Sequence, residues 1–280
     1  MISIKRLFAL VLLCTPAMCA PGKSVGSPGQ AGKCGGAAPG ALAPLPDLGT
    51  TDLHLVADDW SGSGNWASRV GGFTANVTGS PSKIVSVQFP GRYEIGGITI
   101  ANAFRLPANA AHTIQATGAV TYEWIVKSPT AYTASKTAAG YSSVGATQIF
   151  NAAYLTTAGG NMETAVYNSA VAIYLGGVVA SAWQMSGKHN LFTLVVDTTT
   201  PRYEAYINGV SILTDTTVTG TLSPTDTDFG IGARWSAGAA AFQNPWDEGG
   251  TILEVVRHRE ALDDSTVATR AAAFNAAKGY

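Results

Sequence analysis

Apolar and polar residues alternate with a period of two over much of the chain, a pattern typical of β-strands with one buried face. The clearest stretch places four large side chains on one face: Val120, Tyr122, Trp124 and Val126. The segment Leu191–Val196 is instead apolar on both faces, which indicates a central strand that is covered on each side.

Further strands are predicted wherever short apolar runs lie between turn residues. They cover 162–167, 171–175, 178–184, 203–207 and 210–213, together with 84–89, in which Val85, Val87 and Phe89 share a face. Gly176-Gly177 and Asn208-Gly209 supply the positive φ angles that tight hairpins require.

Helical spacing occurs only near the C-terminus. Asp263 or Asp264 begins a predicted helix, Val267, Ala271 and Phe274 share its apolar face, and Gly279 ends it. Many short strands without alternating helices predict an all-β fold: an antiparallel two-sheet jelly-roll sandwich with a short C-terminal helix.

The N-terminal part predicts export. Lys5 and Arg6 precede an apolar run too short to span a membrane, so residues 1–20 are interpreted as a secretory signal peptide. Residues 21–50 are rich in Gly, Pro and Ala and are predicted to form a flexible spacer. Residues 51–280 then form one domain, expected outside the cell as a secreted or cell-surface module.

The charge and the cysteine content limit the kinds of partner that this protein is expected to bind. Charged residues are 12% of the chain and the net charge is −1, so no basic surface for nucleic acid is expected. The cysteines Cys14, Cys19 and Cys34 all precede the predicted domain. Cys34 therefore suggests an intermolecular disulfide or self-association. A lipid anchor on Cys19 or Cys34 is the other reading, although Met18 and Lys33 precede them instead of a small residue.

The order of the C-terminal strands resembles the concanavalin A-like lectin/glucanase superfamily, specifically its laminin G-like jelly-roll domains. The segments that carry the resemblance are Leu53–Gly64, Val120–Lys127, Asn190–Asp197, Tyr203–Gly209, Phe229–Gly232 and Ile252–Leu262. The resemblance implies two curved antiparallel sheets and carbohydrate or protein ligands held by loops at a sheet edge, in some members with calcium.

Retaining glycoside hydrolysis needs two carboxylates about 5 Å apart. The superfamily's hydrolase motif, Glu-x-Asp-x-x-Glu, is absent, and Asp247-Glu248 with Glu254 has the wrong spacing. Glu123 and Glu204 are isolated in their strands, and the histidines show no metal-binding spacing. We therefore expect no enzymatic activity and no required cofactor.

Two kinds of site remain open. Calcium needs oxygen ligands from several loops, and four carboxylates are candidates: Asp58, Asp59, Asp247 and Glu248. The alternative is that these are solvated loop carboxylates. For sugar binding, aromatic rings stack on sugar faces while amides and carboxylates bond hydroxyl groups. The candidates are Trp246, Asp247 and Asn244, with Trp60 and Trp66.

The sequence thus favours a secreted or surface-tethered, non-catalytic module that binds a glycan or glycoprotein, for example in cell adhesion. A structural subunit of an extracellular assembly or filament is the alternative, followed by a divergent glycoside hydrolase.

Overall fold

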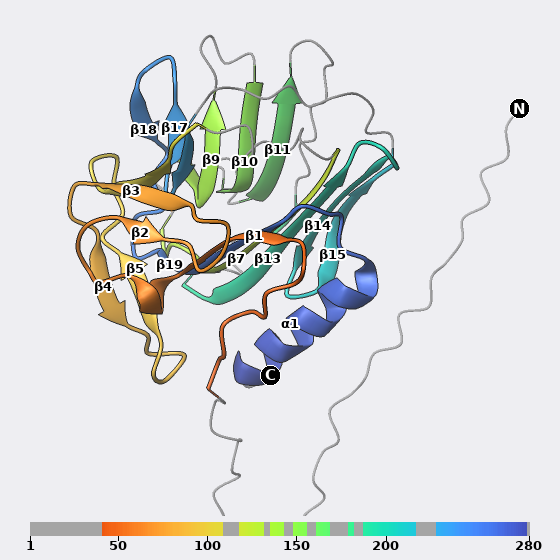
Figure 1. Cartoon of the computed structure of the whole chain (residues 1–280), viewed down its shortest axis with the longest axis horizontal. Coiled ribbons are helices and arrows are strands. Elements are labelled where there is room, and N and C mark those ends of the chain that lie inside the picture. The colour runs from red at the N-terminus through yellow and green to blue at the C-terminus, as the bar shows by residue number, and fades with distance from the viewer. Residues whose placement is uncertain are drawn as a thin grey trace, which may run out of the picture. The chain divides into compact units, whose positions relative to one another are not determined.

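The computed structural model describes residues 41–108, 118–131, 135–142, 148–155, 161–168, 179–181, 187–216 and 228–278. All of them belong to one compact unit. Two β-sheets pack face to face with one helix outside them (Figure 1), which confirms the predicted all-β sandwich with a C-terminal helix. No helix among these residues is long and apolar enough to cross a membrane.

The first sheet is antiparallel and has its strands in the order β15-β14-β13-β7-β19-β5-β4, with β1 also paired to β19. Its strands are β1 (Thr51–Val56), β4 (Ser82–Val85), β5 (Tyr93–Gly96), β7 (Ala119–Lys127), β13 (His189–Asp197), β14 (Arg202–Ile207), β15 (Val210–Asp215) and β19 (Thr251–His258). A short 3₁₀ helix, η1 (Ala57–Asp59), follows β1.

The second sheet has the order β12-β11-β10-β9-β16-β6-β3-β2, with β8, β17 and β18 attached at the side. Its strands are β2 (Trp66–Ala67), β3 (Thr74–Thr78), β6 (Ala103–Leu106), β8 (Lys136–Thr137), β9 (Ala139–Ser142), β10 (Gln148–Leu155), β11 (Asn161–Asn168), β12 (Val179–Ser181), β16 (Phe229–Ile231), β17 (Arg234–Ser236) and β18 (Ala241–Gln243). The β9–β17 pair is parallel, unlike its neighbours.

The main core lies between the sheets and follows the predicted alternation. Val120, Tyr122, Trp124 and Val126 all belong to it, as expected for one face of β7. In β13, Phe192 faces this core, whereas Leu191 belongs to a second apolar cluster on the outer face of the sheet. The central strand is therefore covered on both sides, as its sequence predicts.

The outer cover of the first sheet consists of helix α1 (Asp264–Lys278) and the segment 41–48, which we call the strap (Figure 1). Asp263 caps the helix by accepting a 2.7 Å hydrogen bond from the Thr266 N–H. Phe274 packs with Leu42 and Leu45 of the strap in one cluster. The predicted spacer is therefore wrong for these residues, because apolar side chains bury them against the sheet and the helix.

Buried ionic groups hold the strap as well. The carboxylate of Glu254, on β19, accepts hydrogen bonds from the Leu45 N–H at 2.7 Å and from His54 Nε2 at 2.8 Å. Arg92 bonds the other oxygen of Glu254 at 3.2 Å and donates to the Leu42 carbonyl at 2.9 Å. His54 also pairs with Asp47 of the strap at 2.6 Å. The sheet therefore supplies the charges that the strap's polar groups require in a buried position.

A second carboxylate is used in the same way under helix α1. Glu123, which is fully buried, accepts hydrogen bonds from His258 at 2.9 Å and from Arg270 at 2.8 Å. Arg270 in turn donates to the Pro46 carbonyl at 2.8 Å. The partners of Glu123 are therefore a histidine of the neighbouring strand and an arginine of the helix.

Two turn and strand predictions have different outcomes. Asn208 and Gly209 form the predicted hairpin, with φ angles of 53° and 81°. The prediction that Val85, Val87 and Phe89 share one face of a strand is wrong, because β4 ends at Val85 and the chain turns. Val85 and Val87 are exposed, and only Phe89 is buried.

Several predictions lie outside the described residues. They are the signal peptide, the cysteines, the first part of the spacer, the strand 171–175, the turn Gly176-Gly177 and the helix end at Gly279.

Leu45→Ala tests whether the strap belongs to the folded domain. The side chain is 4% exposed, so its truncation should lower the free energy of unfolding by about 2–5 kcal/mol. Ala43, which is exposed, provides the control, since Ala43→Ser should change it by less than about 0.5 kcal/mol. Equal denaturant midpoints for both variants would show that the strap is not packed in solution.

Burial alone lowers the pKa of His54, but the neighbouring Glu254 and Asp47 carboxylates outweigh it and raise the pKa above 6.5. The protonated form is therefore favoured by folding, and its stabilisation is full below about pH 6.5 and lost as the pH rises through the folded pKa. The free energy of unfolding should thus fall as the pH rises above about pH 6.5 and through the folded pKa, and His54→Gln should reduce this slope.

The measurement stays below pH 8 because burial, with a smaller effect from Lys188, lowers the pKa of Lys278 to about 8. That group has the opposite sign, since a lowered lysine pKa adds stability as the pH rises through it. An unchanged slope in His54→Gln would assign the pH dependence to another group.

Candidate functional site

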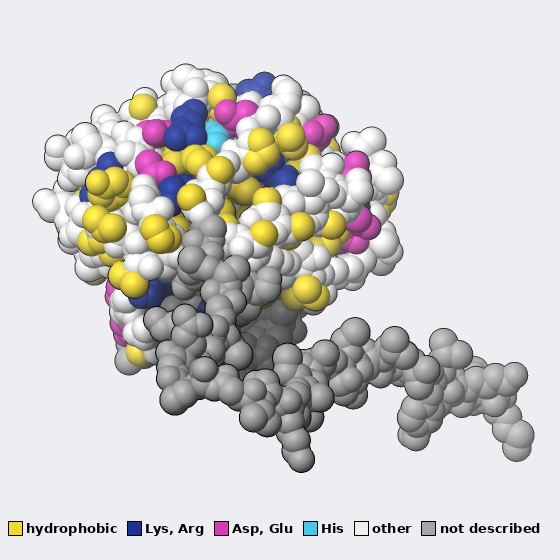
Figure 2. Space-filling model, turned by 90° about the horizontal axis from the view of Figure 1, so that it is seen from below, with side chains coloured by type: hydrophobic (Ala, Val, Ile, Leu, Met, Phe, Trp, Pro, Cys, Tyr) yellow, Lys and Arg dark blue, Asp and Glu magenta, His cyan; other side chains and the backbone are white. Residues whose placement is uncertain are grey.

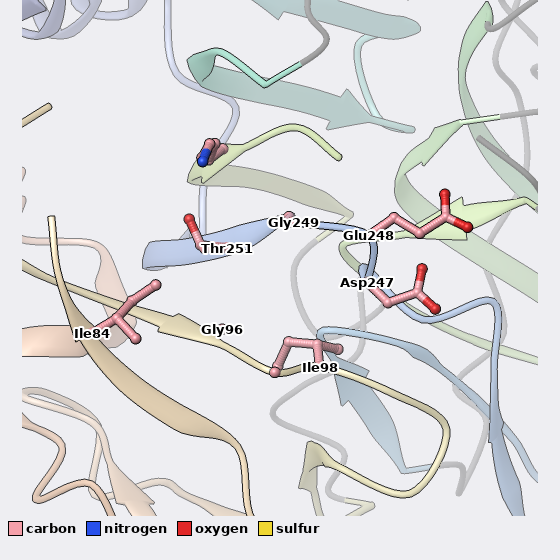
Figure 3. A pocket seen from close by; sticks show the side chains of 10 residues that line it. Ile84, Gly96, Ile98, Asp247, Glu248, Gly249 and Thr251 are labelled. Atoms are coloured by element: carbon pink, nitrogen blue, oxygen red, sulfur yellow. The ribbon is translucent and has the colours of Figure 1, made fainter. Parts of the chain in front are cut away.

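A hollow of about 270 Å³ lies at the edge of the first sheet, between the β4–β5 hairpin and the loop 244–250 that precedes β19 (Figure 3). Its lining consists of Ile84 and Ile98, the polar residues Lys127, Asp247, Glu248 and Thr251, and the glycines Gly96, Gly97, Gly249 and Gly250. Apolar surface with a few converging polar groups is the usual composition of a small-molecule site. The predicted loop therefore does border a concave surface.

Trp246 fixes the shape of this loop. Its side chain is fully buried, its indole N–H donates to the Lys127 carbonyl at 2.9 Å, and its backbone N–H donates to the Gly232 carbonyl at 2.7 Å. A Cβ atom on Gly250 would lie 2.7 Å from Trp246 Cδ1, so only glycine fits there. The ring thus holds the loop from below and leaves the carboxylates that follow it at the surface.

Asp247 and Glu248 lie on one side of the hollow, opposite Ile84 (Figure 3). Lys136, which is 2% exposed, donates a hydrogen bond to Asp247 and lies 3.3 Å from Glu248 Oε1. Glu248 has a positive φ of 53°, and its carbonyl accepts two hydrogen bonds of 2.9 Å from Thr130. One buried ammonium therefore neutralises much of the charge of two carboxylates held in fixed positions.

The buried carboxylate of Glu94 supports the wall of the hollow at Thr251. Thr251 donates its hydroxyl proton to Glu94, whose other oxygen pairs with His189 at 2.8 Å. Burial raises the pKa of Glu94, but hydrogen bonds from His189, Ser86 and Thr251 more than compensate and hold it below the usual value. Glu94 is therefore an anion whose hydrogen-bond acceptors are occupied by these partners.

The three tryptophans predicted to stack on sugars are buried, and this prediction is wrong. Trp60 and Trp66 are 1% and 0% exposed, and both pack edge-on against Phe104 with centroids 5.2 Å apart. Their indole N–H groups donate to the carbonyls of Gly64 and Val56 at 2.9 and 3.0 Å. These rings anchor loops at the ends of the sandwich, so they offer no face to a ligand.

Asn244 also differs from its predicted role. Its backbone carbonyl accepts a 2.8 Å hydrogen bond from Thr137, and its φ of 51° marks a turn position. It does not line the hollow. Of the predicted ligand-binding residues, Asp247 alone lines it.

The predicted calcium ligands do not come together. Asp58 bonds Arg92 and accepts a 2.7 Å hydrogen bond from the Tyr93 N–H, whereas Asp59 pairs with Arg69. That arginine, by its hydrogen bond, holds the pKa of Asp59 below its usual value. Within the described parts of the chain no three acidic, histidine or cysteine side chains form a metal-binding group. Lysine and arginine occupy the positions in which a cation would be needed.

The sequence reasoning missed Lys136, Thr251 and the buried pair of Glu94 with His189. A usable signal was the presence of ionisable residues within otherwise apolar strands, as with Glu254 in Ile-Leu-Glu-Val-Val. Such a residue is buried only with a partner. The partner's identity depends on strand order, which the local sequence does not give.

Trp246→Ala should unfold the loop 244–250 and destabilise the domain. Loss of a fully buried tryptophan costs about 3–5 kcal/mol, measured by chemical denaturation. Trp235→Ala is the matched control, because Trp235 is only partly buried. A Trp246→Ala variant of wild-type stability would restore the idea of an accessible ring.

No protein-family model and no curated protein matches the sequence. Solved structures do resemble it. Domain 4 of AbnA, a GH43 extracellular arabinanase from Geobacillus stearothermophilus in complex with arabinotriose, matches with a TM-score of 0.55 and 17% identity, covering 79% of this chain and 98% of that one. Trypanosoma rangeli sialidase gives 0.55 and 16%, covering 82% of this chain.

The binding domain of Paraclostridial Mosquitocidal Protein 1 gives a TM-score of 0.53 at 10% identity, with 80% of this chain covered. The chain spans 34% of the sialidase and 52% of the mosquitocidal binding domain, but nearly all of the arabinanase domain. The matching regions are all-β sandwich domains, and at these identities the likeness extends to the fold alone.

Proposed function

We propose that this protein is a non-catalytic binding module that recognises a glycan, free or on a glycoprotein, through the hollow beside loop 244–250. The observation that carries the proposal is the pair of carboxylates, Asp247 and Glu248, which Lys136 and Trp246 hold at the mouth of a hollow of about 270 Å³. Ligand sites have volumes of about 300–1,000 Å³, so a hollow of this size suits one sugar ring of a longer chain.

The lining matches the chemistry of a sugar. Carboxylate oxygens of Asp247 and Glu248 can accept hydrogen bonds from sugar hydroxyl groups. Ile84 and Ile98 provide apolar surface for the C–H faces. Four glycines leave backbone open to close approach. Because the polar groups are fixed before binding, little conformational entropy is lost on association.

The absence of catalysis is part of the proposal. Retaining hydrolysis requires one carboxylate as nucleophile and a second that is protonated as acid. The two carboxylates at the hollow share the ammonium of Lys136 instead. Two carboxylates that bond the same cation are arranged as a structural ion pair, which favours binding over hydrolysis.

The solved neighbours are consistent with such a role. One is an arabinanase domain in complex with arabinotriose and another is a toxin binding domain. We propose by the same reasoning that the chain is a divergent member of the lectin/glucanase superfamily, exported and either secreted or held at a surface by its N-terminal segment.

Asp247→Asn tests the site. The wild type should retain one or more oligosaccharides on a glycan array that includes arabinotriose, and calorimetric titration then gives the affinity. Removing the charge of Asp247 should weaken binding about 10-fold, since a hydrogen bond to a charged group contributes about 1.5–3 kcal/mol. Glu248 still bonds Lys136 in this variant, so the fold should persist.

Asp59→Asn is the matched control, because its side chain is 39% exposed compared with 31% for Asp247 and also pairs with a basic residue. It should bind as the wild type does. Equal weakening by both variants, or no retained glycan on the array, would contradict the proposal. Release of shortened oligosaccharides during the titration would instead support the hydrolase alternative.

A further inference from the structure

The strap is attached to the sandwich by side chains and not by a ladder of paired strands. Residues 41–48 form no strand, and Pro44 and Pro46 have no backbone N–H to donate to a sheet. Their backbone is held by three charged side chains of the sandwich and the helix, namely Glu254, Arg92 and Arg270. Figure 2 views the domain from the side of helix α1 and shows acidic, basic and apolar side chains close together on this face. The strap can therefore leave without separating any two strands.

The packing of the strap against helix α1 is incomplete. A hollow of about 230 Å³ lies between them, lined by residues 41–46 and by Ala273, Phe274 and Ala277 of the helix. On this side the strap thus lacks the close packing of a protein interior. Its attachment therefore depends on the charged groups as well as on Leu42 and Leu45.

His54 joins the strap to the sheet through both nitrogens of its ring. Its Nδ1 atom lies 2.6 Å from Asp47 Oδ1 on the strap, and its Nε2 atom lies 2.8 Å from Glu254 Oε1 on β19. An ionised carboxylate only accepts hydrogen bonds, so each nitrogen must donate one. A neutral imidazole has a single N–H and would direct a lone pair at one of the two carboxylates. The observed contacts are therefore those of the protonated ring.

Two other histidines show the contrast. His258 donates from Nε2 to Glu123 at 2.9 Å, and its Nδ1 atom can accept the hydroxyl proton of Thr51 at 3.0 Å. His189 bonds one carboxylate, that of Glu94. Each of these rings can make its bonds while neutral. Among the histidines that the structure describes, only His54 thus needs its charge to keep its contacts.

Burial decides which contact is lost when His54 is neutral. Glu254 is 0% exposed and cannot be hydrated in place, so the remaining proton belongs on Nε2. Asp47 is 41% exposed, and its carboxylate can move into water. Loss of the proton therefore breaks the bond to the strap and leaves the bond within the sheet.

The charged groups around His54 favour the same outcome. They are Asp47 of the strap, Glu254 of β19, Arg92 before β5, and Asp58 and Asp59 of η1 with the Arg69 partner of Asp59. Arg92 bonds Glu254 at 3.2 Å, so Glu254 keeps a cationic partner beside a neutral ring. In the described part of the chain, Asp47 pairs with no cation besides His54.

We propose that the strap is a latch controlled by pH, closed while His54 is protonated and released, beginning at Asp47, when the ring loses its proton. Release exposes the side chains of Leu42 and Leu45 and the surface of α1 at Phe274, which now form one cluster. It also lengthens the connection between the sandwich and the chain before Ala41. The paired strands and the hollow beside loop 244–250 stay as they are, because the strap belongs to neither.

Hydrogen exchange of the Leu45 amide, which donates to Glu254, tests the latch in the full chain. The measured quantity is the protection factor, in which the intrinsic pH dependence of exchange is removed. It should fall by up to about 10-fold per pH unit as the pH rises above about 6.5 and through the folded pKa of His54, which lies above 6.5. Leu45 should also be less protected than the amides of β13, because the strap opens locally.

Asp47→Asn keeps the size of the side chain, and its amide can donate to a neutral ring, so most of the pH dependence at Leu45 should disappear. Asp59→Asn is the matched control, because Asp59 is 39% exposed and pairs with Arg69 instead of the ring. It should retain the wild-type pH dependence. Strong protection of the β13 amides in each variant shows that the fold is retained.

Three results would overturn the proposal. They are a Leu45 protection factor that does not change with pH in the wild type, protection of Leu45 equal to that of β13, and the same pH dependence in Asp47→Asn as in the wild type. Loss of the pH dependence in Asp59→Asn as well would contradict the role of Asp47. Since the readout is exchange at the strap, the result is independent of the function proposed for the hollow.

Discussion

The fully buried carboxylate of Glu254 is the interaction on which the outer half of the domain depends. It lies on the central part of the first sheet and bonds a backbone amide of the strap, the ring of His54 and the guanidinium of Arg92. An unpaired charge in this position would be costly, and removing one partner of a buried ion pair costs about 3–5 kcal/mol. The strap, β1 and β5 are therefore coupled through one side chain.

Two further buried carboxylates of the first sheet are paired in the same way. Glu123 bonds Arg270 of helix α1, and Glu94 bonds His189 and Thr251 beside the hollow. Each pair joins segments that are far apart in the sequence and gives them one fixed register. Beside the hollow, Lys136 pairs in the same way with the surface carboxylates of Asp247 and Glu248. These paired ionisable residues thus fix how the segments that carry them are positioned relative to one another.

Local patterns predicted the elements well, because alternation and capping depend on neighbours in the sequence. The faces of β7, the both-sided burial of β13 and the cap of α1 at Asp263 all follow from short motifs. The burial of the tryptophans does not follow from such motifs, because a ring in a Gly-rich loop has the same local sequence whether it points inward or outward. The packing of the strap depends on Leu42 and Leu45 meeting Phe274, across more than two hundred residues. The loop predicted to hold the ligand does border the hollow, but of the predicted ligand-binding side chains only Asp247 lines it.

The position of the strap has a mechanical consequence. A load applied through the chain before Ala41 reaches Leu42 and Leu45 first, and only then β1, which pairs with the central strand β19. The apolar contacts and the Glu254 hydrogen bond are therefore stretched before any strand of the sandwich. The strap contacts therefore stand between the preceding chain and the strands of the sandwich.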